Sequence, residues 1–232
     1  MIVVGLTGHR GAGKSAVADV LVEDHGFTRM SFAAPLKRML RNVDPIVGYD
    51  VYADCPCGGD ECGPEVDTVR LSDLYGMGYD DETIKESPWG DEVRGLWQRF
   101  GTDTIRAEDK NFWVDKAAKE ILESNHDRIV FTDVRFPNEA EMILNLGGPF
   151  TFDGSMYLSG IQTSLWQISR PEADPDDHES ESHAGLLDED LQIINDGTLD
   201  ELPLMVKAAL DYVIDDVIPN QGLLWAGAVP GE

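Results

Sequence analysis

Positively charged residues are scarce in this sequence. Its 232 residues include 18 lysines and arginines against 44 aspartates and glutamates, a formal net charge of -26. After Arg135, the only lysine or arginine residues in the sequence are Arg170 and Lys207. A protein that neutralises the phosphates of a nucleic acid polymer needs a broad basic surface, and this composition argues against one. An anionic ligand would therefore need a local basic pocket.

Long apolar runs are also missing. No segment approaches the roughly 18 consecutive apolar residues of a membrane span, and no basic leader precedes a cleavable apolar stretch at the N-terminus. With 42% hydrophobic residues, the chain can still bury one sizeable core. We therefore expect a single soluble, cytoplasmic domain over residues 1–232 without a membrane partner. Its oligomeric state stays open, and a homodimer is one alternative.

Cysteines are few and lie close together. Cys55, Cys57 and Cys62 all belong to the stretch DCPCGGDEC. An odd number of cysteines in a chain without an export signal argues against a disulfide framework. Three neighbouring thiolates could bind zinc, but the spacing is not a CxxC pair and a fourth ligand would have to be a nearby carboxylate or a remote residue. A Gly/Pro-rich surface loop is the favoured interpretation, and zinc is the alternative.

Apolar runs alternate with helical patterns in the first half of the chain. Strand patterns cover residues 2–7 and 28–32, and helical patterns cover 15–24, 34–43, 91–101 and 111–125. Residues 44–90 lose this periodicity and accumulate Gly, Pro, Asp and the cysteines. We expect a substrate-side insertion there rather than part of the core.

The second half of the chain continues the alternation. It predicts strands at residues 128–133, 164–171 and 191–196, helices at 137–146 and 198–218, and an extra hairpin within 149–163. Strands that alternate with helices are typical of an α/β fold of three layers, in which helices cover both faces of a mainly parallel sheet. Ligands of such folds bind at the carboxyl ends of the strands.

The stretch GLTGHRGAGKS at residues 5–15 lies between the first strand and the first helix. It has the GxxxxGK[ST] spacing of a phosphate-binding P-loop, in the strand-to-helix setting that the motif requires. Backbone N–H groups would surround a β-phosphate, the lysine would bridge β- and γ-oxygens, and the serine hydroxyl would hold magnesium. The histidine is interpreted as a spacer rather than a base. The candidate ATP-binding residues are Gly8, His9, Arg10, Gly11, Ala12, Gly13, Lys14 and Ser15.

Two cations open the helix that we expect after the second strand. Lys37 and Arg38 would face the same side as the P-loop if the sheet is parallel, and there they could hold the phosphate of an acceptor. An ordinary cationic helix surface explains them equally well. The P-loop motif thus predicts a nucleotide-binding protein, but it does not indicate which molecule would accept a phosphoryl group.

Seven blocks of this chain are typical of one family when they occur together. In order they read GLTGHRGAGKS, FAAPLK, LWQRFGTDTIRAEDKNFWV, FTDVRFPNEAE, ISRP, HESE and INDGTLDEL. They cover most of the chain apart from residues 44–90, part of 149–163 and the tail. With these blocks the chain resembles the deoxynucleoside monophosphate kinases encoded by tailed bacteriophages. The cysteine-bearing stretch departs from that pattern.

This resemblance implies a P-loop nucleoside monophosphate kinase fold and a phosphoryl transfer. The γ-phosphoryl of ATP, with Mg²⁺ as cofactor, would pass to a deoxynucleoside 5′-monophosphate, giving ADP and a deoxynucleoside diphosphate for phage DNA synthesis in the host cytoplasm. Two alternatives stay open, a kinase of the same fold with another acceptor such as dephospho-coenzyme A, and a nucleotide-sensing module without turnover. The presence of both Asp133 and Arg135 counts against the sensing module.

Beside the resemblance, the residues of these blocks suggest individual roles. Asp133 could orient magnesium-bound water and Arg135 could clamp a phosphate, although a pair between the two could simply fix the turn. Trp97 could stack on a base or belong to the core, Gln98 could read a base edge, and Arg106 could hold a phosphate.

The remaining candidates lie in the other blocks. Arg170 resembles the lid arginine of small kinases and would open a lid-like segment at residues 170–185. Asn195 could border the adenine of ATP, although a helix cap made by Thr198 explains that stretch equally well. Asn138, in the block FTDVRFPNEAE, completes the expected substrate-binding residues.

Overall fold

The computed structural model describes residues 1–52, 65–152, 155–158, 160–171, 187 and 189–217. Contacts within the chain divide it into two compact units, one formed by residues 1–32 with 113–232 and the other by residues 33–112. The first unit is therefore built from two separate stretches of sequence. Among the described residues, no helix combines the length and the apolar character needed to cross a membrane.

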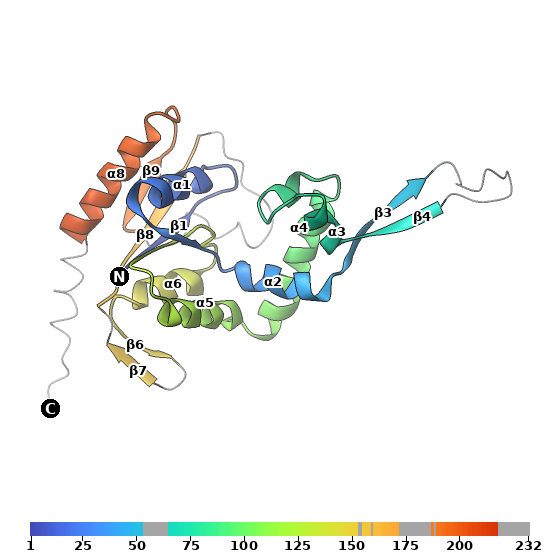
Figure 1. Ribbon diagram of the computed structural model, residues 1–232. Helices are drawn as coiled ribbons and strands as arrows, with labels where there is room; N and C mark the ends of the chain where they lie inside the picture. Colours follow the sequence, from blue (N-terminus) through green and yellow to red (C-terminus); the bar gives the residue numbers. More distant parts are fainter. Residues whose placement is uncertain (53–64, 153–154, 159, 172–186, 188, 218–232) are drawn as a thin grey trace. The chain divides into compact units, whose positions relative to one another are not determined.

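Five strands form the central sheet of the first unit (Figure 1). The order across the sheet is β2-β5-β1-β8-β9, and every neighbouring pair runs parallel. This confirms the α/β fold with a parallel sheet that the sequence predicts. The strands are β1 (Ile2–Thr7), β2 (Thr28–Met30), β5 (Arg128–Phe131), β8 (Gln162–Ser169) and β9 (Leu191–Ile194).

Helices cover both faces of this sheet because its strands are apolar on both sides. On β1, Val4 and Leu6 are buried in one hydrophobic cluster and Val3 is buried in the other, as expected when successive side chains point to opposite faces. The first cluster includes residues of α1 and α8, and the second includes residues of α5 and α6. The four helices are α1 (Lys14–His25), α5 (Phe112–Glu123), α6 (Pro137–Asn145) and α8 (Leu202–Tyr212).

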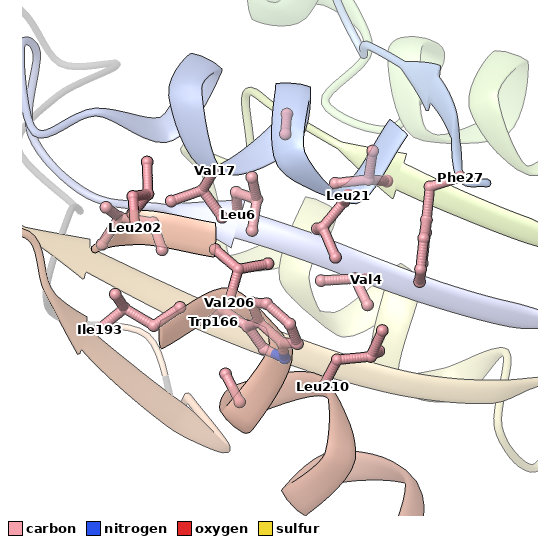
Figure 2. Close-up of a cluster of buried hydrophobic side chains, with 14 of the residues drawn as sticks. Val4, Leu6, Val17, Leu21, Phe27, Trp166, Ile193, Leu202, Val206 and Leu210 are labelled. Atoms are coloured by element: carbon pink, nitrogen blue, oxygen red, sulfur yellow. The ribbon is translucent and has the colours of Figure 1, made fainter. Parts of the chain in front are cut away.

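The core on the α1 and α8 side is built around Trp166 of β8 (Figure 2). This side chain is fully buried, and Val206 and Leu210 of α8 lie against the same cluster. The indole Nε1 donates a hydrogen bond of 3.0 Å to Ser164 Oγ, so burial leaves its polar atom paired. Packing of α8 residues around this one large side chain joins the helix to the sheet.

Some elements of the first unit end elsewhere than the sequence predicts. Strand β5 ends at Phe131, two residues before Asp133, and α8 begins at Leu202 rather than at Thr198. The helix starts late because Pro203 occupies its first turn, where a proline is readily accepted. The hairpin expected within residues 149–163 is confirmed as β6 (Pro149–Phe152) and β7 (Ser155–Leu158), which pair antiparallel. A short π-helical segment, η3 (Val213–Val217), follows α8.

The second unit is a helical unit with one antiparallel hairpin. Much of residues 44–90, where no periodicity was found, is regular structure after all, because strands β3 and β4 pair over two short runs that lack a clear apolar alternation. The elements are α2 (Ala34–Val43), β3 (Ile46–Tyr52), β4 (Glu65–Arg70), α3 (Leu71–Gly76), the 3-10 helix η1 (Thr83–Glu86), α4 (Gly90–Gln98) and the π-helical η2 (Arg99–Arg106).

Candidate functional site

The expected P-loop connects the central strand β1 to α1. Gly8, Gly11 and Gly13 have φ values of 133°, 78° and 97°, which side chains other than glycine rarely adopt. At Gly8 a Cβ atom would lie 2.0 Å from the backbone oxygen of Ile168, so no other residue fits against β8 there. The glycine spacing of the motif is thus required by the backbone of the loop.

The side chain of Lys14 reaches back across the loop. Its Nζ donates hydrogen bonds to the backbone oxygen of Gly8 at 2.6 Å and to that of His9 at 2.8 Å. The lysine is the first residue of α1, and the amide of Val17 donates to the oxygen of Gly13 to begin the helical ladder. An ammonium group, a helix N-terminus and a glycine loop therefore meet at the carboxyl edge of the sheet, as an anion site requires.

Asn195 lies directly after β9, with its side chain against the glycine loop that follows β1. Its Nδ2 donates a hydrogen bond of 3.0 Å to the backbone oxygen of Ala12, and its backbone amide donates to the oxygen of Ser169 at 2.7 Å. The alternative that Thr198 caps the helix is wrong, because α8 begins at Leu202.

Thr198 instead donates hydrogen bonds to the carboxylate of Glu201. Its amide and its hydroxyl both bond to Oε2, at 2.8 and 3.0 Å. These bonds lower the pKa of Glu201 below its usual range, because they favour the ionised carboxylate.

Asp133 joins the carboxyl ends of two neighbouring strands. Its Oδ2 accepts a hydrogen bond of 2.6 Å from Ser31 Oγ, and its Oδ1 accepts one of 2.9 Å from the amide of Phe32. Ser31 and Phe32 follow β2, whereas Asp133 follows β5. The carboxylate is therefore fixed in orientation, and a carboxylate can still accept further hydrogen bonds or metal-bound water at its remaining lone pairs.

The backbone around Arg135 is held by a buried glutamate. The amides of Arg135 and Phe136 donate to Glu139 Oε2 at 2.8 and 3.1 Å. Glu139 is only 4% exposed and lies in the first turn of α6, where a carboxylate pairs with the unsatisfied amides of a helix start. Asn138, which the sequence analysis assigned to substrate binding, is half-buried in the same turn. The turn that carries both candidates is thus rigidly defined.

Candidates from the first unit gather at one edge of the sheet. The glycine loop follows β1, Asp133 follows its neighbour β5 on one side, and Arg170 follows its neighbour β8 on the other. Asn195 follows β9, the next strand along. Parallel strands all end at the same edge, so these residues from distant parts of the sequence share the place where α/β folds bind ligands.

In the second unit, Lys37 and Trp97 lie together. Lys37 Nζ is 4.8 Å from the centre of the Trp97 ring, a cation–π distance, and it also donates to the backbone oxygen of Asp81 at 3.4 Å. Trp97 is half-buried and its Nε1 is buried without a hydrogen-bond partner among the described residues. Trp97 is therefore not a fully buried core residue, and Lys37 lies over its ring.

Other predicted acceptor residues lie on nearby elements of that unit. Arg38 is exposed on α2, Gln98 is the half-buried last residue of α4, and Arg106 is the half-buried last residue of η2. Leu36 packs so closely on Gly101 of η2 that a Cβ atom there would lie 2.7 Å from its side chain. Helix α2 and η2 thus contact each other directly.

A cluster of side chains around Asp81 was not predicted from the sequence. Tyr75 donates a hydrogen bond of 2.8 Å from its hydroxyl to Asp81 Oδ1, and Arg41 forms an ion pair with the same oxygen. Arg41 also lies over the Tyr75 ring at 4.5 Å. Its position four residues after Lys37 on α2 was the one sequence signal, because residues at this spacing share a helix face.

Burial and hydrogen bonds within this cluster shift the pKa values of its three titratable side chains. Burial works to raise the pKa of Asp81, but hydrogen bonds from Arg41 and Tyr75 lower it overall. Burial raises the pKa of the Tyr75 hydroxyl. The pKa of Arg41 is raised by its hydrogen bonds to Tyr75 and Asp81. At neutral pH the cluster is therefore an ionised Arg–Asp pair beside a neutral tyrosine.

Some predicted features lie wholly or partly outside the described residues. The cysteines Cys55, Cys57 and Cys62 do, so the zinc alternative stays a prediction. Arg170 itself is exposed at the end of β8, whereas most of the expected lid segment, from residue 172 onwards, is outside. In the part of the chain that the structure describes, no group of three or more His, Cys, Asp and Glu side chains is arranged to hold a metal ion.

A family match and a viral relative both indicate one family. The family described as deoxynucleotide monophosphate kinase matches this chain over residues 80–206. A protein of Acanthamoeba polyphaga mimivirus named "Putative deoxynucleotide monophosphate kinase" is 27% identical over 227 residues, covering 91% of this chain and 97% of the viral protein. A distant likeness to the crystal structure of TT1252 from Thermus thermophilus has 15% identity and a TM-score of 0.38, and covers 90% of this chain and 96% of that one. The family match spans more than half of the sequence and includes the DVRFPNEAE block, so the chain belongs to the deoxynucleotide monophosphate kinase family.

Proposed function

We propose that this kinase transfers the γ-phosphoryl group of ATP to deoxynucleoside 5′-monophosphates, giving ADP and deoxynucleoside diphosphates. The observation that carries the proposal is the P-loop after β1, in which glycines with positive φ and Lys14 form an anion site at the carboxyl edge of the sheet. Family membership supports a nucleotide monophosphate as the acceptor.

In this mechanism the P-loop binds the triphosphate of ATP. Backbone amides of residues 9–15 donate to the phosphate oxygens, and Lys14 exchanges its bonds to Gly8 and His9 for bonds to β- and γ-oxygens. The loop needs little rearrangement for this, because its glycines already hold the strained backbone. Binding energy is then available to orient the phosphoryl group for in-line transfer.

The residues present fit a magnesium ion that is bound together with ATP. Ser15 offers a hydroxyl in the first turn of α1, and Asp133 offers a carboxylate whose orientation is fixed by Ser31 and Phe32. Mg²⁺ prefers such oxygen ligands, few of them from protein and the rest from water and phosphate. When bound, the ion neutralises negative charge on the phosphate oxygens. Ser15 would contact the ion directly, and Asp133 would orient water bound to it.

Arginines would stabilise the charge of the transferring group and its acceptor. Arg135, at the rigid turn before α6, would clamp the acceptor phosphate, since a guanidinium can bind two phosphate oxygens at once. Arg170, exposed after β8, would close over the phosphoryl group as part of a lid. No general base is needed, because the acceptor phosphate is already ionised near neutral pH.

Further candidates for contacts to the acceptor nucleotide lie within the second unit. Lys37 is held between the Trp97 ring and the oxygen of Asp81, so its ammonium is positioned before any ligand binds. Trp97 and Gln98 would contact the base, and Arg38 and Arg106 would add positive charge for the phosphate. A chain with a net charge of -26 needs such a local concentration of cations to hold an anionic acceptor.

A coupled assay of ADP release tests the proposal directly. ATP and Mg²⁺ are supplied with each of the four common deoxynucleoside monophosphates, dUMP, modified deoxynucleotides, the ribonucleotides and dephospho-coenzyme A. ADP release that depends on at least one deoxynucleoside monophosphate is the expected result. Release only with dephospho-coenzyme A would identify a different acceptor, and ATP binding without turnover on any acceptor would identify a sensing module.

A further inference from the structure

Asn195 holds the P-loop through a single peptide group, that between Ala12 and Gly13. Its Nδ2 donates to the Ala12 oxygen at 3.0 Å, and only the amide nitrogen of the side chain can do this, because a carbonyl oxygen accepts and never donates. The Asn195 backbone is itself fixed, since its own amide donates to the oxygen of Ser169 at the end of β8. The loop is therefore tied to the sheet by a side chain 183 residues away.

A second observation places the same amide against the loop. A Cβ atom at Gly13 would lie 2.1 Å from Asn195 Nδ2 and 3.3 Å from its Cγ. The side-chain amide thus packs directly on the α-carbon of Gly13, which has a φ of 97°. Glycine at this position allows both the left-handed backbone and the close approach of Asn195.

The direction of the hydrogen bond determines the direction of the neighbouring N–H. The described chain contains no cis peptide bond, so the Ala12 C=O and the Gly13 N–H point in opposite directions across one planar group. With the carbonyl turned toward Asn195, the Gly13 N–H is turned away from it. Glycine rotates easily about φ, so without this bond the peptide could flip and present a carbonyl oxygen where the N–H had been.

We propose that Asn195 is a positioning residue that fixes the Ala12–Gly13 peptide so that the Gly13 N–H donates to a phosphate of the bound nucleotide. This inference rests on the proposed function, in which the loop binds the triphosphate. It replaces the expectation that Asn195 borders adenine with a role that does not depend on the base. The ligand it serves is any polyphosphate chain that the loop can surround.

Exchange of Asn195 for aspartate or alanine tests the inference, because the two changes act differently on the peptide. Aspartate has nearly the same shape but accepts only, so it repels the Ala12 oxygen and favours a flipped peptide whose N–H points at the new carboxylate. Alanine merely removes the bond. We expect N195A to weaken polyphosphate binding by about 3–10-fold, the range for one net hydrogen bond, and N195D to weaken it more than N195A.

The experiment is calorimetric titration of the full chain with inorganic tripolyphosphate and with ATP, each in the presence of Mg²⁺. The expected result is a parallel loss of affinity for both ligands, in the order wild type, N195A, N195D. Gln192→Glu is the matched control, since it adds the same charge to an exposed side chain of β9, the strand that precedes Asn195, and should leave both affinities within about twofold. Thermal unfolding of each variant confirms that the loss occurs in folded protein.

Each other outcome decides against a specific part of this account. Loss of ATP affinity with unchanged tripolyphosphate affinity would show that Asn195 contacts the nucleoside and would overturn the inference. N195D equal to or better than N195A would show that the side chain only fills space, which also overturns it. If N195D does not fold, unchanged tripolyphosphate affinity of N195A suffices to overturn it. A wild-type chain that binds neither ligand would instead refute the proposed function, and this inference with it.

Discussion

Asparagine in place of Asp133 separates the charge of this side chain from its hydrogen bonds. The carboxylate accepts one bond from Ser31 Oγ and one from the amide of Phe32. An asparagine can keep both, because its oxygen accepts from the backbone amide while its NH₂ group donates to the serine hydroxyl. Alanine keeps neither. The asparagine variant therefore retains the tie between β2 and β5 and loses only the negative charge.

The expected stability changes follow from these two bonds. A hydrogen bond to a charged group contributes about 1.5–3 kcal/mol and a neutral one about 0.5–1.5 kcal/mol. D133N should therefore lower the free energy of unfolding by about 2 kcal/mol, and D133A by about 3 kcal/mol or more, because two bonds are lost. Ser31→Ala, which keeps the charge and removes one bond to it, should cost about 1.5–3 kcal/mol. Denaturant unfolding of the three variants measures these values.

The dependence of ADP release on the Mg²⁺ concentration tests the role of the negative charge on Asp133. If Asp133 orients water bound to Mg²⁺, D133N should need about 10–100-fold more Mg²⁺ for half-maximal ADP release, the range found when a group behind a metal ligand is lost. Ser31→Ala should keep the wild-type requirement, and excess chelator should abolish activity in every variant. Wild-type magnesium dependence in D133N would refute this reasoning and leave Asp133 a structural tie.

Three further predictions follow from the site and the fold. Lys14→Ala should reduce kcat by roughly 10²-fold or more, whereas Arg135→Ala should mainly raise the acceptor KM by about tenfold. Steady-state kinetics, with ATP affinity measured separately, distinguishes the two effects. If Arg135→Ala weakened only ATP binding, the donor and acceptor sides of the site would have to be exchanged. Serine in place of all three cysteines of residues 55–62 should leave ATP binding intact, and stoichiometric zinc whose removal unfolds the protein would contradict this. Gly8→Ala should destabilise the protein by about 2 kcal/mol or more, because its Cβ would lie 2.0 Å from the Ile168 oxygen at a φ of 133°, and an unchanged denaturation midpoint would contradict that reason.

Local patterns predicted the parallel sheet and the position of the glycine loop between β1 and α1. The apolar run of β1 and the glycine spacing after it depend on neighbouring residues only, so the strand, the loop and α1 could be placed from the sequence. Helix α2 was predicted at its observed bounds for the same reason. The hairpin of β3 and β4 was missed because its pairing lies between two runs without a clear alternation of apolar residues.

Contacts between distant residues could not be predicted. Asn195 and Ala12 are 183 residues apart, and Ser31 and Asp133 are 102 apart. No periodicity or motif links such positions, because their meeting depends on the order of strands in the sheet. The sequence therefore identified Asp133 and Asn195 as candidates, but their hydrogen-bond partners required the fold.

The strand order of the sheet also constrains how the chain is made. Strand β1 lies between β5 and β8, so Ile2 pairs with Arg128 and Gln162. On a ribosome that adds about 5–20 residues per second, roughly 10–30 seconds separate the synthesis of β1 from that of its last partner. Until β5 is synthesised, the apolar residues of β1 have no neighbouring strand to pair with, whereas residues 33–112 can already form their own hairpin and helices. The first strand of this sheet is thus synthesised well before either of its neighbours, and a chaperone that shields it during translation would raise the yield of folded protein.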